Sequence, residues 1–284
     1  MLELLQITND PAFARRCDAL DGMRMFVDLE RMGKAERQAG RNTFISSHQI
    51  GDVGLVKAQV SRSRLMVRVN PLHAGTSEEV DAVLAQGLKQ GTGPNADMLM
   101  LPMFEGPADL GAFVDIVAGR CLVVALLETS SALTSLDSWI AIPGLTEVFV
   151  GLNDLHTSLG MRFMFEPLAC GVVDRVAEAA KRQGLRFGFG GIARLDEGML
   201  PGRDVLAEHV RLGSGAVILS RTFHRSGKQT DLEAEVQSLR DVEARLSRRS
   251  RHEMETDRQR VATCIASIAE RTSPGPVAAP AARA

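Results

Sequence analysis

Two acidic residues, Glu128 and Asp154, are the positions in this sequence best suited to hold a divalent cation. Each stands at the end of an apolar run, in the segments LLETSSAL at 126–133 and VGLNDLHTSLG at 150–160. Runs rich in Val, Leu and Phe are typical of parallel strands that are covered on both faces, where a charge is costly unless it serves a site. The pair therefore predicts an enzyme with an acidic metal centre. Helix capping is the alternative role for each acid, because Asp and similar residues favour helix N-termini.

Other predicted strand ends supply further groups for the same chemistry. They are Asp28, Glu30, Arg68, Asn70, Pro102 and Asn153. Oxygen ligands suit Mg²⁺ or Mn²⁺, and a cation held by only two carboxylates keeps positions open for a bidentate 2-oxo acid. Arg68 keeps its proton and can donate to the oxygen that becomes negative when a 2-oxo acid turns into its enolate. An ion pair at the strand end is the alternative role for Arg68.

Three histidines are candidates for moving protons. Cleavage of a carbon–carbon bond through an enolate needs a base and an acid, and histidine titrates near neutral pH. His156, in DLHTSLG, is the catalytic candidate, with a surface or capping position as its alternative role. His73 follows the third predicted strand. His48 lies in SSHQIGD, a predicted helix start capped by Ser46 or Ser47, and we expect a structural role for it.

Asp28 and Glu30, at the end of the second predicted strand, are further catalytic candidates. Glu30 follows an apolar strand, so burial could raise its pKa and allow it to transfer protons. An ion pair with Arg31, Lys34 or Arg68 is the alternative role for Glu30.

Eight apolar segments with the composition of strands recur along the chain. They span residues 2–8, 23–30, 64–70, 97–103, 122–128, 147–154, 186–192 and 216–221. Helix-patterned stretches separate most of them, for example 47–60, 77–88, 106–119 and 166–184, the last with Gly184 as a stop signal. Eight such units in about 250 residues predict the α/β fold of a (β/α)8 TIM barrel, with the site at the carboxyl ends of its strands. A doubly wound open sheet is the competing architecture, although the GxGxxG fingerprint is absent.

The chain divides into three predicted parts. Residues 1–225 form the catalytic barrel, 226–272 a C-terminal helical extension and 273–284 a disordered tail. The extension is charged and rich in helix formers, so we expect one or two helices outside the barrel. Leu and Val recur in it at helical spacing, which predicts packing on the barrel or on another subunit.

Composition excludes several classes of protein. The 284 residues are 45% hydrophobic and carry a formal net charge of −2, and the arginines are interleaved with acids, so we expect no nucleic-acid partner. No apolar run reaches the ~20 residues of a membrane span, and no secretory signal precedes the first strand. We therefore expect a cytoplasmic protein without a membrane partner. The 4 cysteines are scattered and predict free thiols.

Five segments resemble the HpcH/HpaI aldolase and citrate lyase β-subunit family. They are FVDLERMGK, MVRVN, MLMLPMF, LLETSSAL and VFVGLNDLHTSLG, within roughly residues 20–225. The resemblance implies that Glu128 and Asp154 bind the divalent metal and that Arg68 is the catalytic arginine. It also implies a pyruvate-like 2-oxo acid or acyl-CoA substrate and, together with the helical extension, a homo-oligomer.

The sequence departs from the family at one informative place. HpaI-type aldolases follow an Asp-x-Glu with a histidine that moves protons, whereas Arg31 follows Asp28-Leu-Glu30 here. Citrate-lyase-like members have Leu-Glu-Asp at this place, so Arg31 departs from their pattern as well. The segment MVRVN, in contrast, resembles the lyases more than the aldolases. The resemblance therefore does not indicate which residue acts as the general base.

The leading functional hypothesis is a divalent-metal-dependent carbon–carbon lyase, aldolase or citrate-lyase-like, that acts through a pyruvate-type enolate. A second hypothesis is a phosphate-binding isomerase or decarboxylase barrel that uses the glycine-rich turns at 187–195 and 211–221, with Arg194, Ser214 and Ser220. Close packing is the other explanation for these glycines. A third hypothesis, motivated by the missing histidine, is a barrel that binds a 2-oxo acid without turnover.

Overall fold

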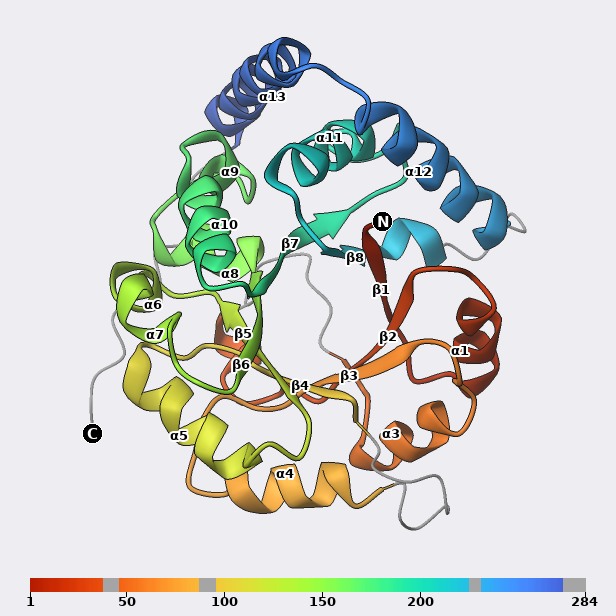
Figure 1. The fold of residues 1–284 in the computed structure, drawn as a ribbon, viewed down its shortest axis with the longest axis vertical. Coiled ribbons are helices and arrows are strands. Elements are labelled where there is room, and N and C mark those ends of the chain that lie inside the picture. The colour runs from red at the N-terminus through yellow and green to blue at the C-terminus, as the bar shows by residue number, and fades with distance from the viewer. Residues whose placement is uncertain (38–45, 87–95, 225–230, 273–284) are drawn as a thin grey trace.

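The structure is a computed structural model, which describes residues 1–37, 46–86, 96–224 and 231–272. Eight parallel strands close into a barrel in which each strand pairs with the next and β8 pairs with β1 (Figure 1). The strands are β1 (Glu3–Ile7), β2 (Met23–Asp28), β3 (Arg64–Arg68), β4 (Met98–Leu101), β5 (Leu122–Leu127), β6 (Leu145–Val150), β7 (Arg186–Ile192) and β8 (Ala216–Leu219). The predicted (β/α)8 barrel is confirmed, and every predicted strand corresponds to an observed one.

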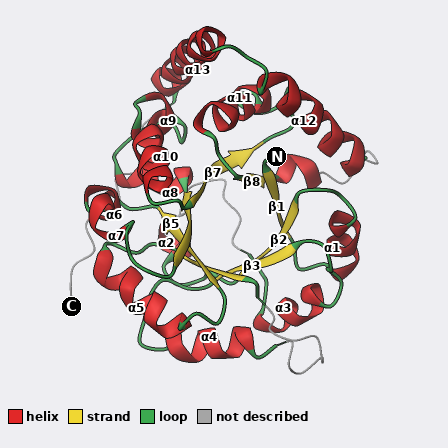
Figure 2. Cartoon of the chain, in the orientation of Figure 1, coloured by secondary structure: helices red, strands yellow, loops and turns green. Residues whose placement is uncertain are grey.

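Helices surround the barrel as a ring (Figure 2). In chain order they are α1 (Pro11–Asp18), α2 (Lys34–Arg37), α3 (Ile50–Lys57), α4 (Thr76–Leu84), α5 (Pro107–Val117), α6 (Ser130–Thr134), α7 (Leu136–Trp139), α8 (Leu152–Ser158), α9 (Glu166–Ala169), α10 (Val172–Arg182), α11 (Gly202–Leu212), α12 (Leu232–Leu246) and α13 (Arg251–Arg271). The longer helices that connect two strands lie outside the sheet, as right-handed βαβ crossovers require, whereas the short α2 lies at the mouth of the barrel (Figure 2).

Two local predictions are wrong. The helix expected over 166–184 is two helices, α9 and α10, because Gly171 between them adopts a left-handed conformation with φ 82°. The predicted cap of α3 is also misplaced. The N-cap is Gln49, whose backbone and side chain form a capping box with Asp52, while the hydroxyl of Ser46 accepts a hydrogen bond from the backbone N–H of His48.

Side chains on the strands divide into two apolar layers. The layer inside the barrel consists of Leu5, Phe26, Met66, Met98, Met100, Val124, Leu126, Phe149 and Ala216. The alternate strand residues point outward and pack against the helices in a larger core that contains the only tryptophan, Trp139, in edge-on contact with Phe104. Strands that are apolar on both faces explain why the sequence shows continuous runs rather than alternation.

A buried ion pair closes the interior near the amino-terminal ends of the strands. Arg24 on β2 donates two hydrogen bonds across the barrel to Glu147 on β6, with N–O distances of 2.8 and 2.9 Å, and neither side chain is exposed. Glu3 and Arg186 add ion pairs at the edge of this group. The two positive and two negative charges of this group cancel.

The C-terminal helices pack on the barrel. α12 lies against α11 and holds the first strand, because Arg240 donates to the carbonyl oxygen of Leu2 (2.6 Å) and Glu243 accepts from the N–H of Leu2 (2.7 Å). It thus takes the place of the outer helix that follows β8, while α13 forms an additional layer over α9 and α11. None of the helices in the described ranges combines the length and the apolar character needed to cross a membrane. The predicted tail at 273–284 lies outside the described residues.

Replacement of Glu147 tests the buried ion pair. We expect Glu147→Gln to lower the free energy of unfolding by about 3 kcal/mol, because it leaves the Arg24 guanidinium desolvated with a weaker partner. Urea unfolding followed by circular dichroism measures the change. Asp137→Asn is the matched control, since its carboxylate is 73% exposed and pairs with Arg175 and Arg182 at 3.6 to 3.7 Å, and it should change stability by less than about 0.5 kcal/mol. Equal effects of the two substitutions would contradict the prediction.

Candidate active site

A cavity of about 530 Å³ opens at the carboxyl ends of the strands. Its floor is the upper part of the apolar interior, including Phe26, Met100, Leu126 and Phe149. Polar side chains at strand ends and in the loops that follow them line the rest. They are Asp28, Lys34, Ser46, His48, Arg68, Glu128, Asn153, Asp154, Ser220 and Arg221. Parallel closure of the barrel therefore brings most of the predicted site residues to one cavity.

Glu128 and Asp154 lie side by side because they follow two neighbouring strands. Glu128 comes directly after β5, and Asp154 lies in the first turn of α8, after β6. Neither acid caps a helix: Thr129 caps α6 by accepting the N–H of Ala132, and the N-cap of α8 is Gly151. The capping alternative is therefore wrong for both acids.

The electrostatics of the two acids suit a bound cation. Burial raises the pKa of Glu128 well above its usual range, and the neighbouring Asp154 carboxylate raises it further. Burial also raises the pKa of Asp154, against the lowering effect of Arg37. The Oε2 atom of Glu128 is buried and has no hydrogen-bond partner among the described residues. A divalent ion would relieve all three features, so these residues fit Mg²⁺ or Mn²⁺.

The protein contributes only part of a coordination sphere. Among the described residues, no group of three or more His, Cys, Asp or Glu side chains could hold a metal ion. A cation between Glu128 and Asp154 would therefore keep several positions for water or substrate oxygens. The glycine at 151 leaves space for the glutamate, since a Cβ atom there would lie 2.5 Å from its Oε1.

Arg68 is oriented by a bidentate ion pair. Its Nε and Nη2 atoms each donate to Asp28 at 2.9 Å, while Nη1 lies 3.2 Å from Glu30 and 3.9 Å from Glu128. Burial by itself would lower the pKa of Arg68, but the carboxylates of Asp28 and Glu30 outweigh it and hold the pKa above its usual range. The ion pair predicted as the alternative role of Arg68 is present. It directs the Nη1 edge of the guanidinium toward Glu30 and Glu128.

Asp28 and Glu30 serve as partners of cations. Asp28 accepts hydrogen bonds from Arg68 and from Lys34 (2.8 Å). Burial would raise the pKa of Asp28, but these two cations hold it below its usual range. Glu30 is 1% exposed and forms ion pairs with Lys34, Arg37 and Arg68. Glu30 therefore forms ion pairs, as its predicted alternative role requires. It is not among the residues that line the cavity.

Two cations of α2 belong to the site although the sequence analysis did not select them as site residues. Lys34 lies between the carboxylates of Asp28 and Glu30, and Arg37 pairs with Glu30 and lies 3.9 Å from Asp154. Both are on one short helix, three residues apart, so they face the same side. The spacing Lys-x-x-Arg directly after the Asp-x-Glu strand end was the available signal.

Asn70 holds the segment that carries these cations. Its Oδ1 accepts the backbone N–H groups of Arg31 (2.9 Å) and Met32 (3.0 Å), and its amide donates to Glu79 (2.8 Å). Arg31, which replaces the aldolase histidine, donates to the carbonyl oxygen of His48 at 2.8 Å and lies outside the cavity lining. The guanidinium of Arg31 thus stabilises the segment around His48 and does not line the cavity.

The three histidines have different surroundings. His48 is buried and lines the cavity, where its Nδ1 accepts the backbone N–H of Asp28 at 3.1 Å. His156 bonds through Nδ1 to the carbonyl oxygen of Leu152 on its own helix and is not among the cavity-lining residues. His73 pairs with Glu79 at 3.2 Å, away from the cavity.

Pro102 is likewise outside the cavity lining, whereas Asn153 belongs to it. The residues that the phosphate hypothesis names do not all lie at the cavity. Ser220 lines the cavity, but Arg194 pairs with Glu197 and Glu235, and Ser214 bonds to His209 and to a backbone carbonyl. Of the three residues named for phosphate binding, Ser220 is the one that lines the cavity.

Comparison with known proteins identifies the family. The family profile described as HpcH/HpaI aldolase/citrate lyase matches residues 25–189. The chain belongs to this family. The activities that name the family break or form carbon–carbon bonds, so this member of the HpcH/HpaI family is an enzyme of the lyase and aldolase class. A search of curated proteins found no significant match.

Solved structures of the HpcH/HpaI family share the fold. A family protein from Burkholderia cenocepacia J2315 is 18% identical with a TM-score of 0.61, over 85% of this chain and 94% of that chain. The citrate lyase β subunit of Mycobacterium tuberculosis, complexed with oxaloacetate and magnesium, is 17% identical with a TM-score of 0.57, over 87% and 97%. The M. tuberculosis protein CitE in complex with magnesium, acetoacetate and coenzyme A is 16% identical with a TM-score of 0.57, over 92% and 86%. At these identities the likeness concerns the fold.

A small substitution next to Glu128 tests the cation site without removal of a ligand. We expect Gly151→Ala to weaken Mg²⁺ or Mn²⁺ binding at least tenfold, because the new Cβ displaces the Glu128 carboxylate. Isothermal titration calorimetry measures the affinity. Gly51→Ala, at a helical glycine with no atom within 4 Å of its added Cβ, is the control and should bind the ion like the wild type. Unchanged affinity of the Gly151→Ala protein would exclude Glu128 as a ligand in this conformation.

Proposed function

We propose that the protein is a divalent-metal-dependent carbon–carbon lyase that acts through a pyruvate-type enolate on a 2-oxo acid or an acyl-CoA substrate. One observation carries the proposal: a pair of buried acids with raised pKa values lies beside the directed Nη1 edge of Arg68. This is the combination of groups that an enolate requires, a cation for its oxygens and a fixed donor for the charge that develops.

The two acids would hold Mg²⁺ or Mn²⁺. A bound ion would supply Lewis-acid polarisation of the carbonyl group of a 2-oxo acid. The magnesium that accompanies oxaloacetate in the M. tuberculosis citrate lyase β subunit supports this choice of ion and of ligand class. The coenzyme A in the related complex supports an acyl-CoA as the alternative substrate.

Residues of the chain would perform the other steps. Arg68 donates to the substrate oxygen that gains negative charge, and Asp28 keeps the guanidinium in the required orientation through two hydrogen bonds. Asn153 lies beside Asp154 in the cavity wall and is a candidate to bind the substrate. The apolar floor formed by Phe26, Leu126 and Phe149 excludes water from below the reacting atoms.

The charges of the site match an anionic substrate only after a cation binds. Four carboxylates (Asp28, Glu30, Glu128 and Asp154) and four cations (Lys34, Arg37, Arg68 and Arg221) balance in charge. A divalent ion gives the site a net positive charge. We therefore infer that the ion binds before the substrate carboxylate.

The decisive assay measures pyruvate or oxaloacetate release from a panel of 4-hydroxy-2-oxo acids and CoA thioesters. We expect release with Mg²⁺ or Mn²⁺, none with EDTA, and at least a 100-fold lower kcat for Glu128→Ala. Glu105→Ala, at an exposed acid outside the cavity lining, is the control and should keep full activity.

Each outcome separates the hypotheses. Release that survives EDTA would contradict the metal-dependent mechanism. Binding of Mg²⁺ and pyruvate without release from any substrate would instead identify a barrel that binds a 2-oxo acid without turnover. The cytoplasmic location and the homo-oligomer stay predictions, and a monomeric mass in solution would contradict the second.

A further inference from the structure

Lys34 is a buried cation on the wall of the cavity. Its side chain is 2% exposed, and Nζ lies 2.8 Å from Asp28 Oδ2 and 3.2 Å from Glu30 Oε2. These two carboxylates are its partners within the described part of the chain. An ammonium group has three N–H donors, so one remains for a group in the cavity.

Lys34 is not the only cation that contacts its two partners. Asp28 is also paired with Arg68, and Glu30 is also paired with Arg68 and Arg37. A buried ammonium group whose partners are shared in this way can still stabilise a negative group of a ligand.

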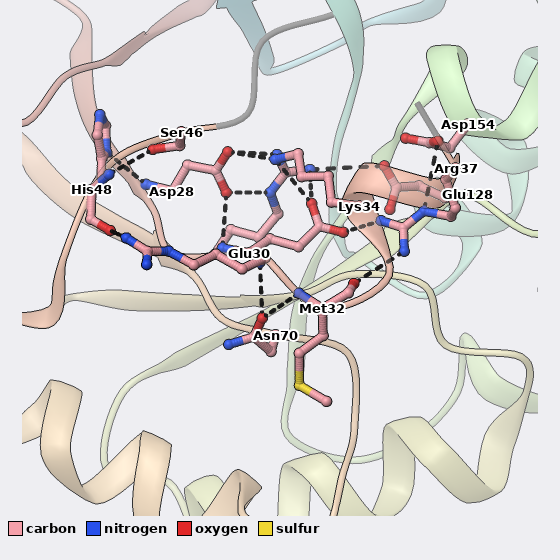
Figure 3. A network of polar contacts seen from close by, with 12 residues as sticks. Asp28, Glu30, Met32, Lys34, Arg37, Ser46, His48, Asn70, Glu128 and Asp154 are labelled. Carbon is pink, nitrogen blue, oxygen red and sulfur yellow. Dashed lines mark hydrogen bonds and ion pairs between the residues drawn. The ribbon is translucent and has the colours of Figure 1, made fainter. Parts of the chain in front are cut away.

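The position of Lys34 indicates which part of a ligand it meets. Figure 3 shows Lys34 between Asp28 on one side and Glu128 with Asp154 on the other. Its ion pairs in the described residues are with Asp28 and Glu30, whereas Arg68 is the residue that approaches Glu128. Lys34 and Arg68 contact the same oxygens of Asp28 and Glu30, so the two cations are neighbours on the cavity wall. An enolate oxygen at Arg68 would therefore leave Lys34 for an adjacent part of the ligand.

Other cavity residues are less suited to this position. His48 accepts the backbone N–H of Asp28 through Nδ1, and burial lowers its pKa, so the ring is neutral. Ser46 and Ser220 offer uncharged hydroxyls, which stabilise a developing charge less than an ammonium group does. Arg31 bonds to backbone carbonyl oxygens outside the cavity lining.

We propose that Lys34 is a further catalytic residue that donates a hydrogen bond to the carbonyl oxygen of the second reactant, an aldehyde or ketone. The role rests on the proposed enolate chemistry. As the enolate carbon bonds to the acceptor carbon, the π electron pair of the acceptor carbonyl moves onto its oxygen. Lys34 stabilises this negative charge while solvent, which received the methyl proton during enolisation, supplies the proton of the hydroxyl. Cleavage follows the same path in reverse.

Two reactions of the same enzyme separate this role from support of Arg68. Exchange of the methyl hydrogens of pyruvate in D₂O with Mg²⁺, followed by NMR, needs the enolate but no acceptor. Cleavage of a 4-hydroxy-2-oxo acid needs both. We expect Lys34→Met to lower kcat for cleavage about 100-fold and to leave deuterium exchange within about threefold of the wild type.

Two further variants keep the test interpretable. Lys34→Arg keeps the charge, so it should retain part of the cleavage rate that Lys34→Met loses. It can be tested even if Lys34→Met is poorly folded. Lys57→Met removes a lysine that pairs with Asp97 at 2.7 Å outside the cavity lining, and both rates should stay at wild-type values. A parallel loss of exchange and cleavage in the Lys34 variants, or no loss of either, would overturn the role. Absence of both reactions in the wild type would instead overturn the enolate chemistry on which it rests.

Discussion

The ion pair between Asp28 and Arg68 is the contact on which the arrangement of the candidate site depends. The two residues are direct partners in the register of the neighbouring strands β2 and β3, so the sheet itself places carboxylate and guanidinium side by side. The pair uses two donors of Arg68 and leaves Nη1 directed toward Glu30 and Glu128. A one-residue change in register would turn one of the partners to the other face of the sheet and remove the pair.

Buried charged groups are paired differently at the two ends of the barrel. At the amino-terminal end, Arg24 and Glu147 pair within a group that has an equal number of positive and negative charges. At the carboxyl end, Glu128 Oε2 has no hydrogen-bond partner among the described residues, and Glu128 and Asp154 both have raised pKa values. Charge that is left unbalanced in a desolvated place is typical of a functional site, and balanced charge is typical of a structural one.

The described residues between β2 and α3 supply several side chains of the candidate site. This segment brings Lys34 and Arg37 onto the acids and His48 onto the cavity wall, and Asn70 of the next strand end holds its backbone. The residue that replaces the aldolase histidine, Arg31, takes part in the support of this segment. The arginine at that position therefore supports the segment that brings Lys34 and Arg37 onto the acids.

The sequence by itself determined the barrel, the approximate strand ends, and the selection of Glu128, Asp154 and Arg68. This was possible because strand composition and the order of elements are local properties, and a closed parallel barrel leaves one place for all carboxyl ends. Only the tertiary structure decided which polar residues share the cavity. Lys34 and His48 line it, and Arg37 approaches its acid Asp154, whereas His156 and Pro102 are outside the lining. Their positions depend on how a loop folds back and on hydrogen bonds between distant segments, which no periodicity in the chain encodes.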